Sequence, residues 1–321
     1  MHIPDGFLSA RVAAGSGVTA GLGVAFACAR VRATGLGARR ALLGVSAAFV
    51  FAAQLVNFPV AAGTSGHLIG AALVAALLGL PAAIVVMTAV LVVQCLVFGD
   101  GGVLALGANV LNMALVSCVV GYSVDRLACG KNPSPTRRVA AVAFAGWCAT
   151  VAAAVSCAEE LALSGVARFG VVLPAMVGVH ALIGIGEAMI SGLLVASVLR
   201  LRPELLARAS ANHSRNALGS GLGLALVAAL LLAPFSSAAP DGLLRVAAGL
   251  GAQAHASSPS SAPLPDYTLP GLGTGALATV LVGACGALLI FGLCWLFARL
   301  VVPRRRGSAT AESTPSPIAA E

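Results

Sequence analysis

Residues 67–98 read HLIGAALVAALLGLPAAIVVMTAVLVVQCLVF and contain no Asp, Glu, Lys or Arg. An apolar run of this length is typical of a bilayer-crossing segment, and it shows none of the period-two alternation of a barrel strand. Gly79-Leu80-Pro81 interrupts the run, because glycine and proline end and restart helices. We therefore predict two short helices, at about 67–80 and about 82–98.

The whole chain has the same apolar character. Its 321 residues are 59% hydrophobic and 9% charged, with a mean hydropathy of +0.99, which a soluble domain could not bury. We predict an all-α integral membrane protein, with a seven-helix bundle followed by two C-terminal transmembrane helices. The nine helices are expected at about 10–30, 41–60, 67–80, 82–98, 103–124, 138–163, 170–199, 218–234 and 271–301.

The net charge of +8 does not indicate nucleic-acid binding, because Lys and Arg form short clusters between apolar spans. The clusters are Arg30, Arg32, Arg39 and Arg40; Arg126, Lys131, Arg137 and Arg138; Arg200, Arg202, Arg208 and Arg215; and Arg304, Arg305 and Arg306. Each follows an odd-numbered span, so the positive-inside rule predicts an extracytoplasmic N-terminus and a cytoplasmic C-terminus. A single helix over 67–98 would reverse every later assignment. A cleaved signal peptide is disfavoured, because the basic residues follow the first apolar run.

The chain begins Met1-His2-Ile3-Pro4-Asp5-Gly6. The bulky His2 predicts that Met1 is retained, which leaves three nitrogens in a row: the α-amine, the His2 amide and the His2 imidazole. Amine and amide close a five-membered chelate ring, and amide and Nδ1 close a six-membered one. Such a set suits Cu(II) or Ni(II), and Co(II) less strictly, once the amide has lost its proton.

A fourth nitrogen would complete a square around the ion. His67 follows Gly63-Thr64-Ser65-Gly66 at the outer mouth of a predicted span, on the same side as Met1. It is the best candidate for that nitrogen; the alternative is a helix-end imidazole bonded to water or backbone. Asp100, in an outer loop, is a candidate lid residue, a charge that attracts cations, or a turn residue.

Polar side chains inside apolar spans are costly in lipid and should face the interior of the bundle. Asn57, Gln94 and Asn109 are therefore candidates for bonding the far nitrogens of His2 or His67 and fixing their tautomers. The alternative is that they bridge helices.

His180 and Glu187 lie seven residues apart, on one face of a predicted helix. An intramembrane acid with a histidine is typical of a proton relay, and equally of a buried pair that holds helices together. We favour the structural role, because both residues are remote from the N-terminal chelator.

Several stretches form a recognisable set: Met1–Ser9, Asn57-Phe58-Pro59-Val60, Gly63–His67, Gln94, Phe98–Gly102, Asn109 with Asn112, and Gly178–Gly184. Together they resemble the substrate-binding membrane subunit of cobalt/nickel energy-coupling-factor transporters, the CbiM/NikM family. The resemblance implies a seven-helix subunit whose N-terminus tucks into the bundle. Its ion ligands would be the Met1 amine, the His2 amide and imidazole, and His67. Ser65 joins the polar candidates as a supporting or access residue.

The C-terminal part resembles a small two-helix accessory subunit of the NikN or PDGLE type, fused to the first. Its marker is Pro240-Asp241-Gly242-Leu243 in an outer loop, with Leu244 where that family usually has Glu. We expect a metal-binding domain at about 1–217, an accessory domain at about 218–302 and a disordered cytoplasmic tail at about 303–321.

The sequence has no Gly-x-x-x-x-Gly-Lys-Ser/Thr phosphate loop, and no nucleophile–base arrangement indicates an enzyme. The resemblance implies partners: a transmembrane coupling subunit and two cytoplasmic ATPases. Small residues on the first span are the candidate docking face for the coupling subunit, with intrachain packing as the alternative. They are Ala10, Ala13, Ala14 and Gly17.

We therefore predict the substrate-capture subunit of an ATP-driven importer in the bacterial cell membrane. It would carry Co²⁺ or Ni²⁺, between which the sequence does not choose, and hold no intrinsic cofactor. The alternatives are a secondary cation transporter or channel that uses His180 and Glu187, and a membrane scaffold without a metal site.

Overall fold

A computed structural model describes residues 1–34, 40–61, 63–201, 223, 236–252, 262–268 and 276–301. The helices are α1 (Ala10–Thr34), α2 (Arg40–Gln54), α3 (Ala71–Leu78), α4 (Leu80–Phe98), α5 (Leu106–Asn109), the π-helix η2 (Val110–Val116), α6 (Ser117–Cys129), α7 (Pro135–Leu163), α8 (Phe169–Leu201), α10 (Gly242–Gly249), the 3₁₀ helix η6 (Pro265–Tyr267) and α11 (Ala276–Val301). One antiparallel hairpin pairs β1 (Phe58–Pro59) with β2 (Ser65–Gly66).

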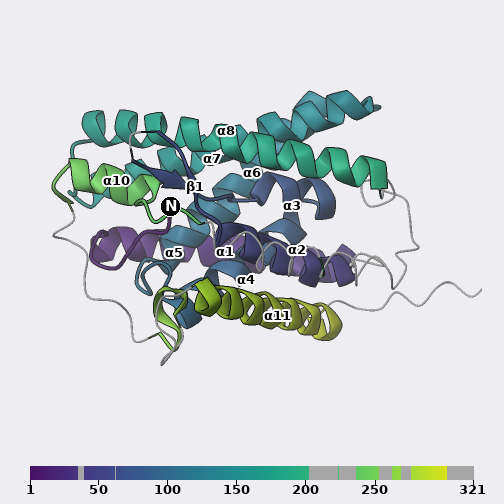
Figure 1. The fold of residues 1–321 in the computed structure, drawn as a ribbon, viewed down its shortest axis with the longest axis horizontal. Coiled ribbons are helices and arrows are strands. Elements are labelled where there is room, and N and C mark those ends of the chain that lie inside the picture. The colour runs from purple at the N-terminus through teal and green to yellow at the C-terminus, as the bar shows by residue number, and fades with distance from the viewer. Residues whose placement is uncertain are drawn as a thin grey trace, which may run out of the picture.

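Six of the helical segments are long and apolar enough to cross a bilayer: α1, α4, the continuous α5–η2–α6, α7, α8 and α11. They form a bundle (Figure 1). α1 exposes Val18, Leu22 and Phe26, whose exposed fractions are 63–69%, along one stripe at helical spacing. Such a stripe is suited to lipid. The prediction of an all-α, multi-pass membrane protein is confirmed.

The second and third predicted helices have wrong boundaries. The second ends at Gln54 instead of continuing to residue 60, and β1 follows it. The third begins at Ala71, after Gly70 with a φ of 80°. At 1.5 Å per residue the eight residues of α3 are about 12 Å long, too short to cross a bilayer alone. The stretch 55–70 is apolar enough to resemble a span, but its described residues, 55–61 and 63–70, form the hairpin and its flanking loops.

The predicted break at Gly79-Leu80-Pro81 is confirmed. Gly79, with a φ of 85°, ends α3, and Pro81 lies in the first turn of α4, where its missing N–H costs no helix hydrogen bond. The predicted helix at 218–234, apart from residue 223, and the tail after residue 303 lie outside the described residues.

Basic side chains join several helix ends at one end of the bundle. Arg138, in the first turn of α7, donates from Nη1 to both oxygens of Asp125 at 3.0 Å and from Nη2 to the Ala76 carbonyl at 3.3 Å. These contacts bring together the ends of α3 and α6 and the start of α7. The far end of α7 reaches α1, where Ser16 donates to Glu160 at 2.6 Å.

Irregular segments converge at that second end of the bundle. They are the chain start, the β1–β2 hairpin, the loop between α4 and α5, and the residues that lead into α10 (Figure 1). The backbone N–H and C=O groups of these segments make no helix hydrogen bonds, so they can bind side chains and each other. The candidate site lies among these segments.

Candidate metal site

The first residues of the chain lie inside the bundle, where the exposed fractions of Met1 and Ile3 are 5% and 0%. Asn109 binds the Ile3 backbone twice: Ile3 N–H donates to Oδ1 at 2.8 Å, and Nδ2 donates to the Ile3 carbonyl at 3.2 Å. The Gly102 N–H donates to the same carbonyl at 2.9 Å. The chain start is therefore fixed to α5 and to the loop before it.

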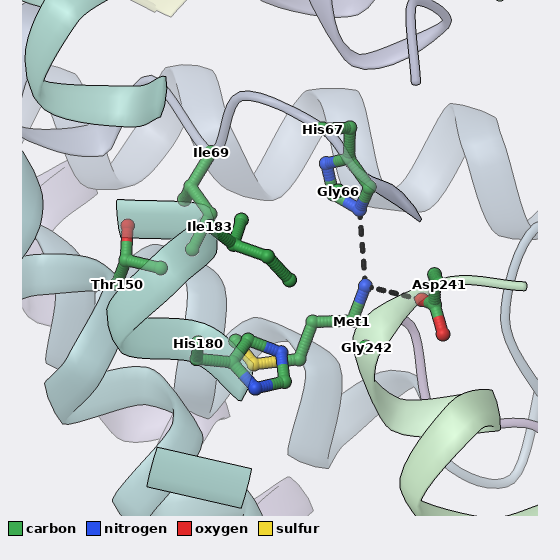
Figure 2. Close-up of a pocket in the computed structure, with 9 residues that line it drawn as sticks. All are labelled: Met1, Gly66, His67, Ile69, Thr150, His180, Ile183, Asp241 and Gly242. Atoms are coloured by element: carbon green, nitrogen blue, oxygen red, sulfur yellow. Dashed lines mark hydrogen bonds and ion pairs between the residues drawn. The ribbon is translucent and has the colours of Figure 1, made fainter. Parts of the chain in front are cut away.

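The Met1 amine lies between an imidazole and a carboxylate (Figure 2). Its nitrogen is 3.0 Å from His67 Nε2 and 2.6 Å from Asp241 Oδ2. His67 Nδ1 faces the Leu68 carbonyl at 3.1 Å, which assigns the ring proton to Nδ1 and leaves the Nε2 lone pair toward the amine. Burial, together with the Met1 ammonium, holds the pKa of His67 well below its ordinary value. His67 is thus a neutral imidazole, the form that binds metal.

The backbone on both sides of His67 is held by α8. Gly66 packs so closely on Ile183 that an added Cβ would lie 2.6 Å from that side chain. Glu187, 1% exposed, accepts the N–H of Ile69 at 2.6 Å and of Gly70 at 2.9 Å. The carboxylate is therefore the buried anchor of the turn that follows His67.

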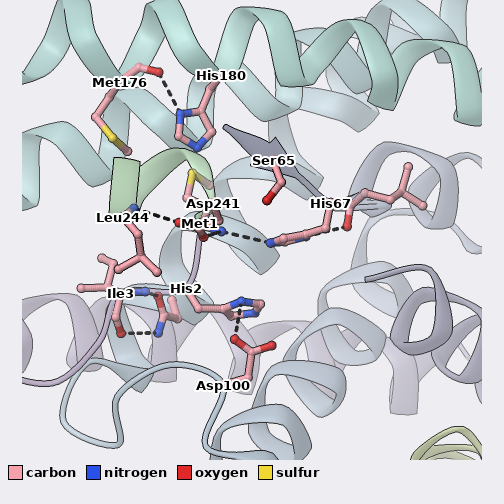
Figure 3. Close-up of polar contacts among 12 residues, drawn as sticks. Met1, His2, Ile3, Ser65, His67, Asp100, Met176, His180, Asp241 and Leu244 are labelled. Carbon is pink, nitrogen blue, oxygen red and sulfur yellow. Dashed lines mark hydrogen bonds and ion pairs between the residues drawn. The ribbon is translucent and has the colours of Figure 1, made fainter. Parts of the chain in front are cut away.

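His2 faces a different carboxylate (Figure 3). Its Nδ1 is 3.0 Å from Asp100 Oδ1, and its ring stacks on that of His67 with centroids 5.3 Å apart and planes 17° apart. Within the described residues, the buried Nε2 of His2 has no hydrogen-bond partner. Partial burial alone would raise the pKa of Asp100, but His2 and the Tyr267 hydroxyl outweigh it, so this pKa lies below its ordinary value.

Asp241 belongs to a stretch, residues 236–244, that we call the accessory segment. It runs along the hairpin: the Ser65 N–H donates to the Pro240 carbonyl at 2.9 Å and the Ser65 hydroxyl to the Ala239 carbonyl at 2.7 Å. Asp241 is also the N-cap of α10, accepting from the Leu244 N–H at 2.8 Å. The Met1 ammonium outweighs burial and holds the pKa of Asp241 below its ordinary value.

His180 is not remote from the N-terminus, which corrects the sequence-based expectation. It lines a cavity of about 10 Å³, the size of one water molecule, together with Met1, His67 and Asp241 (Figure 2). His180 Nδ1 donates to the Met176 carbonyl at 2.8 Å, and Glu187 has the two backbone partners given above. The two residues are therefore not a bonded pair.

Asn57, Gln94 and Asn109 do not fix the imidazole tautomers, so that expectation is wrong. Gln94 donates to the Gln54 side chain at 2.8 Å, and the Asn57 backbone binds the accessory segment through Ser236 at 2.8 Å. The far nitrogen of His67 binds the Leu68 carbonyl instead, and among the described residues the far nitrogen of His2, Nε2, has no hydrogen-bond partner.

The four docking candidates on α1 differ in exposure. Ala10 and Ala14 are exposed and Ala13 is half-buried. The Gly17 backbone lies against α5, because an added Cβ on Gly107 would collide with it, although a Cβ added at Gly17 itself would meet nothing within 4 Å. The close approach of α1 to α5 at this point fits the alternative interpretation, intrachain packing, for Gly17 alone.

Sequence reasoning missed the functional place of two residues. Asp241 was noted only as part of a loop marker, and Tyr267 was not noted at all. Tyr267 donates its hydroxyl to Asp100 Oδ2 at 2.7 Å and stacks on Phe98, with ring centroids 4.8 Å apart. The available signal was weak: a second Pro-Asp-Gly, and one of only two tyrosines in the chain.

The arrangement brings together the Met1 amine, the His2 backbone and ring, and His67. Among the described residues, no group of three or more His, Cys, Asp or Glu side chains could hold a metal ion. A metal at this place would therefore need the amine and a backbone nitrogen as well as imidazoles. Nitrogen donors of this kind favour late first-row divalent ions.

Comparisons with known proteins identify relatives among metal transport proteins. Residues 2–205 match the family model of the cobalt uptake substrate-specific transmembrane region, CbiM, and residues 215–303 match the PDGLE domain. The chain is 37% identical to a putative fused nickel transport protein NikMN of Archaeoglobus fulgidus, covering 93% of this chain and 98% of that one. It is 34% identical to the fused nickel transport protein NikMN of Rhodobacter capsulatus, covering 95% and 99%.

A solved structure is also similar. The crystal structure of a truncated transition metal transporter has 34% sequence identity and a TM-score of 0.56, covering 62% of this chain and 99% of that one. Since the first family model matches more than half of the residues, the chain belongs to the CbiM family of cobalt uptake transmembrane proteins, in a form that also carries a PDGLE domain.

Proposed function

We propose that this protein captures Ni²⁺ or Co²⁺ at its N-terminus and delivers the ion to an ATP-driven importer of the energy-coupling-factor type. The observation that carries the proposal is the buried Met1 amine, 3.0 Å from His67 Nε2. An amine buried beside a neutral imidazole, with the His2 amide and ring next in sequence, supplies four nitrogens. The nickel transport described for the fused relatives supports the choice of ion.

Ion binding requires three changes at this site. The ammonium and the His2 amide each lose a proton to solvent, which makes affinity fall as the pH falls. The ammonium also leaves Asp241. The His2 ring turns, because nitrogen lone pairs lie in the ring plane and two stacked rings do not aim both at one ion.

Partners supply the energy in this proposal. The chain carries no phosphate-binding loop of the Walker type, so a transmembrane coupling subunit and two ATPases would drive release. The exposed side of α1, including Ala10 and Ala14, is the proposed dock. The extracytoplasmic N-terminus follows from the basic clusters, which include Arg126 and Arg138 at the end of the bundle away from Met1.

The test has a binding arm and a transport arm. Purified wild type, His2→Ala, His67→Ala and His180→Ala would be titrated with Ni²⁺ and Co²⁺. We expect one-to-one binding that the first two substitutions abolish. Membrane vesicles with and without the coupling and ATPase subunits would then be assayed for uptake, which should require all subunits and ATP.

The second candidate is secondary cation transport through His180 and Glu187. The observation in its favour is the buried Nε2 of His180 near the site, which has no hydrogen-bond partner in the part of the chain that the structure describes. This candidate predicts uptake without any ATPase, lost in His180→Ala, with ion binding unchanged in His67→Ala. Those outcomes would contradict the leading proposal.

A further inference from the structure

Two linked hydrogen bonds, from His2 to Asp100 and from Tyr267 to Asp100, hold the His2 ring in an orientation that cannot chelate a metal ion. Nδ1, the nitrogen that closes a six-membered ring with the His2 amide, lies 3.0 Å from Asp100 Oδ1. The other carboxylate oxygen, Oδ2, accepts the Tyr267 hydroxyl at 2.7 Å. Asp100 thus occupies the one imidazole nitrogen that an amino-terminal chelate requires (Figure 3).

Asp100 is itself firmly placed. It follows Gly99, which ends α4 with a φ of 68°, and its N–H donates to the Gln94 carbonyl at 3.0 Å. Tyr267 is fixed by stacking on Phe98 and by edge contact with Phe51, at centroid distances of 4.8 and 6.2 Å. The carboxylate therefore cannot follow a turning His2 ring without breaking a bond to Tyr267.

Tyr267 adopts a backbone conformation that is rare for residues other than glycine. Its φ is 56° and that of Asp266 is 51°, both in the left-handed region. Two consecutive non-glycine residues in this region are strained, and such a conformation persists only where surrounding contacts hold it. Tyr267 is held by its ring contacts with Phe98 and Phe51 and by its hydrogen bond to Asp100, so η6 and Asp100 stabilise each other's positions.

These contacts sit beside a wide cavity of about 760 Å³, whose lining includes His2, His67, Asp100, Asp241 and Tyr267. An arriving cation in this cavity would find the His2 Nδ1 already bonded. Resting on the proposed function, we infer that Asp100 and Tyr267 form a latch that competes with the metal ion for His2. Ion binding turns His2 away from Asp100 and thereby loosens η6, so that occupancy of the site is signalled to the C-terminal part of the chain.

If Asp100 is part of a latch, its removal should change metal affinity in the opposite direction from the removal of a residue that supports the metal ligands. If Asp100 merely oriented His2 for the metal, then its loss would weaken binding, as loss of an outer-shell partner usually does. If Asp100 competes, then its loss tightens binding. A charge-assisted hydrogen bond is strong enough that its removal should tighten binding about tenfold.

The experiment measures Ni²⁺ affinity of the full chain by competition with a chromogenic chelator at one pH. Asp100→Asn removes the charge, and Tyr267→Phe keeps the charge but frees the carboxylate. Glu159→Gln and Tyr122→Phe are the matched controls, since they remove one exposed carboxylate charge and one hydroxyl at residues that do not line the cavities around His2 and Met1. Melting temperature and the Ni²⁺ d–d absorption band would be recorded for every variant, to show that fold and ligand set are retained.

We expect about tenfold tighter binding for Asp100→Asn, a few-fold for Tyr267→Phe, none for the controls, and an unchanged absorption band. Weaker or unchanged binding in both latch variants, with wild type binding normally, would overturn the latch and leave the proposed function standing. Should Asp100→Asn fail to fold, Tyr267→Phe alone decides the question. Absence of Ni²⁺ binding in wild type would instead overturn the proposed function.

Discussion

An extension of the N-terminus tests the amine most directly. Met1 is 5% exposed, and the cavity it lines has about 10 Å³ of free space, enough for one water molecule. Each added residue lengthens the backbone by about 3.8 Å, so an extended chain cannot keep its first nitrogen beside His67. The extension would also convert the Met1 amine to an amide, which removes the amine as a ligand and abolishes its ion pair with Asp241.

The length of the extension matters. One added Gly would place His2 third in the chain, and an amine, two amides and an imidazole can then close a square by themselves. Two glycines ahead of Met1 avoid this artefact. We expect Ni²⁺ affinity to fall at least about 100-fold, the upper range for losing an outer-shell partner, because here a ligand itself is lost.

The assay is titration calorimetry of the Gly-Gly form before and after a protease cuts directly in front of Met1. Cleavage should restore the affinity of the unextended protein, which excludes misfolding as the cause. An affinity within threefold of wild type before cleavage would refute the reasoning and remove the amine from the site.

Three further substitutions separate the roles of neighbouring groups. Asn109→Leu removes both bonds to Ile3, so Ni²⁺ affinity measured by calorimetry should fall about tenfold. Glu187→Gln leaves one of two buried N–H groups without an acceptor. The free energy of unfolding should therefore fall by about 1–3 kcal/mol, and ion binding should weaken. Unchanged ion binding together with lost uptake would favour the secondary transporter. Asp241→Asn keeps the N-cap but loses the ion pair with Met1. Because the pKa of Asp241 is lowered by folding, its stabilisation is present at neutral pH and disappears as the pH falls below about 4, so the melting temperatures of wild type and variant should converge in acid.

The helical membrane fold follows from the sequence because burial in lipid imposes long apolar runs. The break at Gly79 was also predictable, because glycine readily adopts the positive φ that ends α3 and proline is tolerated in the first turn of the helix that follows. Residues 55–70 misled because hydropathy reports where a side chain is buried and not whether its backbone is helical. Their non-helical path is held by Glu187, more than a hundred residues away, and no local pattern contains that contact.

The site divides in the same way. The approach of Met1 to His67 was predictable, because each carries a nitrogen that the same ion chemistry needs. The carboxylate partners of Met1 and His2 were not predictable. Asp241 and Asp100 lie in polar loops, where acidic residues are common and do not by themselves indicate a contact. Nothing in the sequence relates Tyr267 to Asp100, since their contact crosses 167 positions.

The contact between Met1 and Asp241 joins residues 240 positions apart. At a synthesis rate of about 5–20 residues per second, the first residue waits about 10–50 seconds for its partner to be made. For most of that time the hairpin, which ends at Gly66, has already been made, but the accessory segment has not. The first nitrogen of the chain therefore gains its carboxylate partner only after about three quarters of the chain has been made, although its neighbours around His67 and Asn109 exist much earlier.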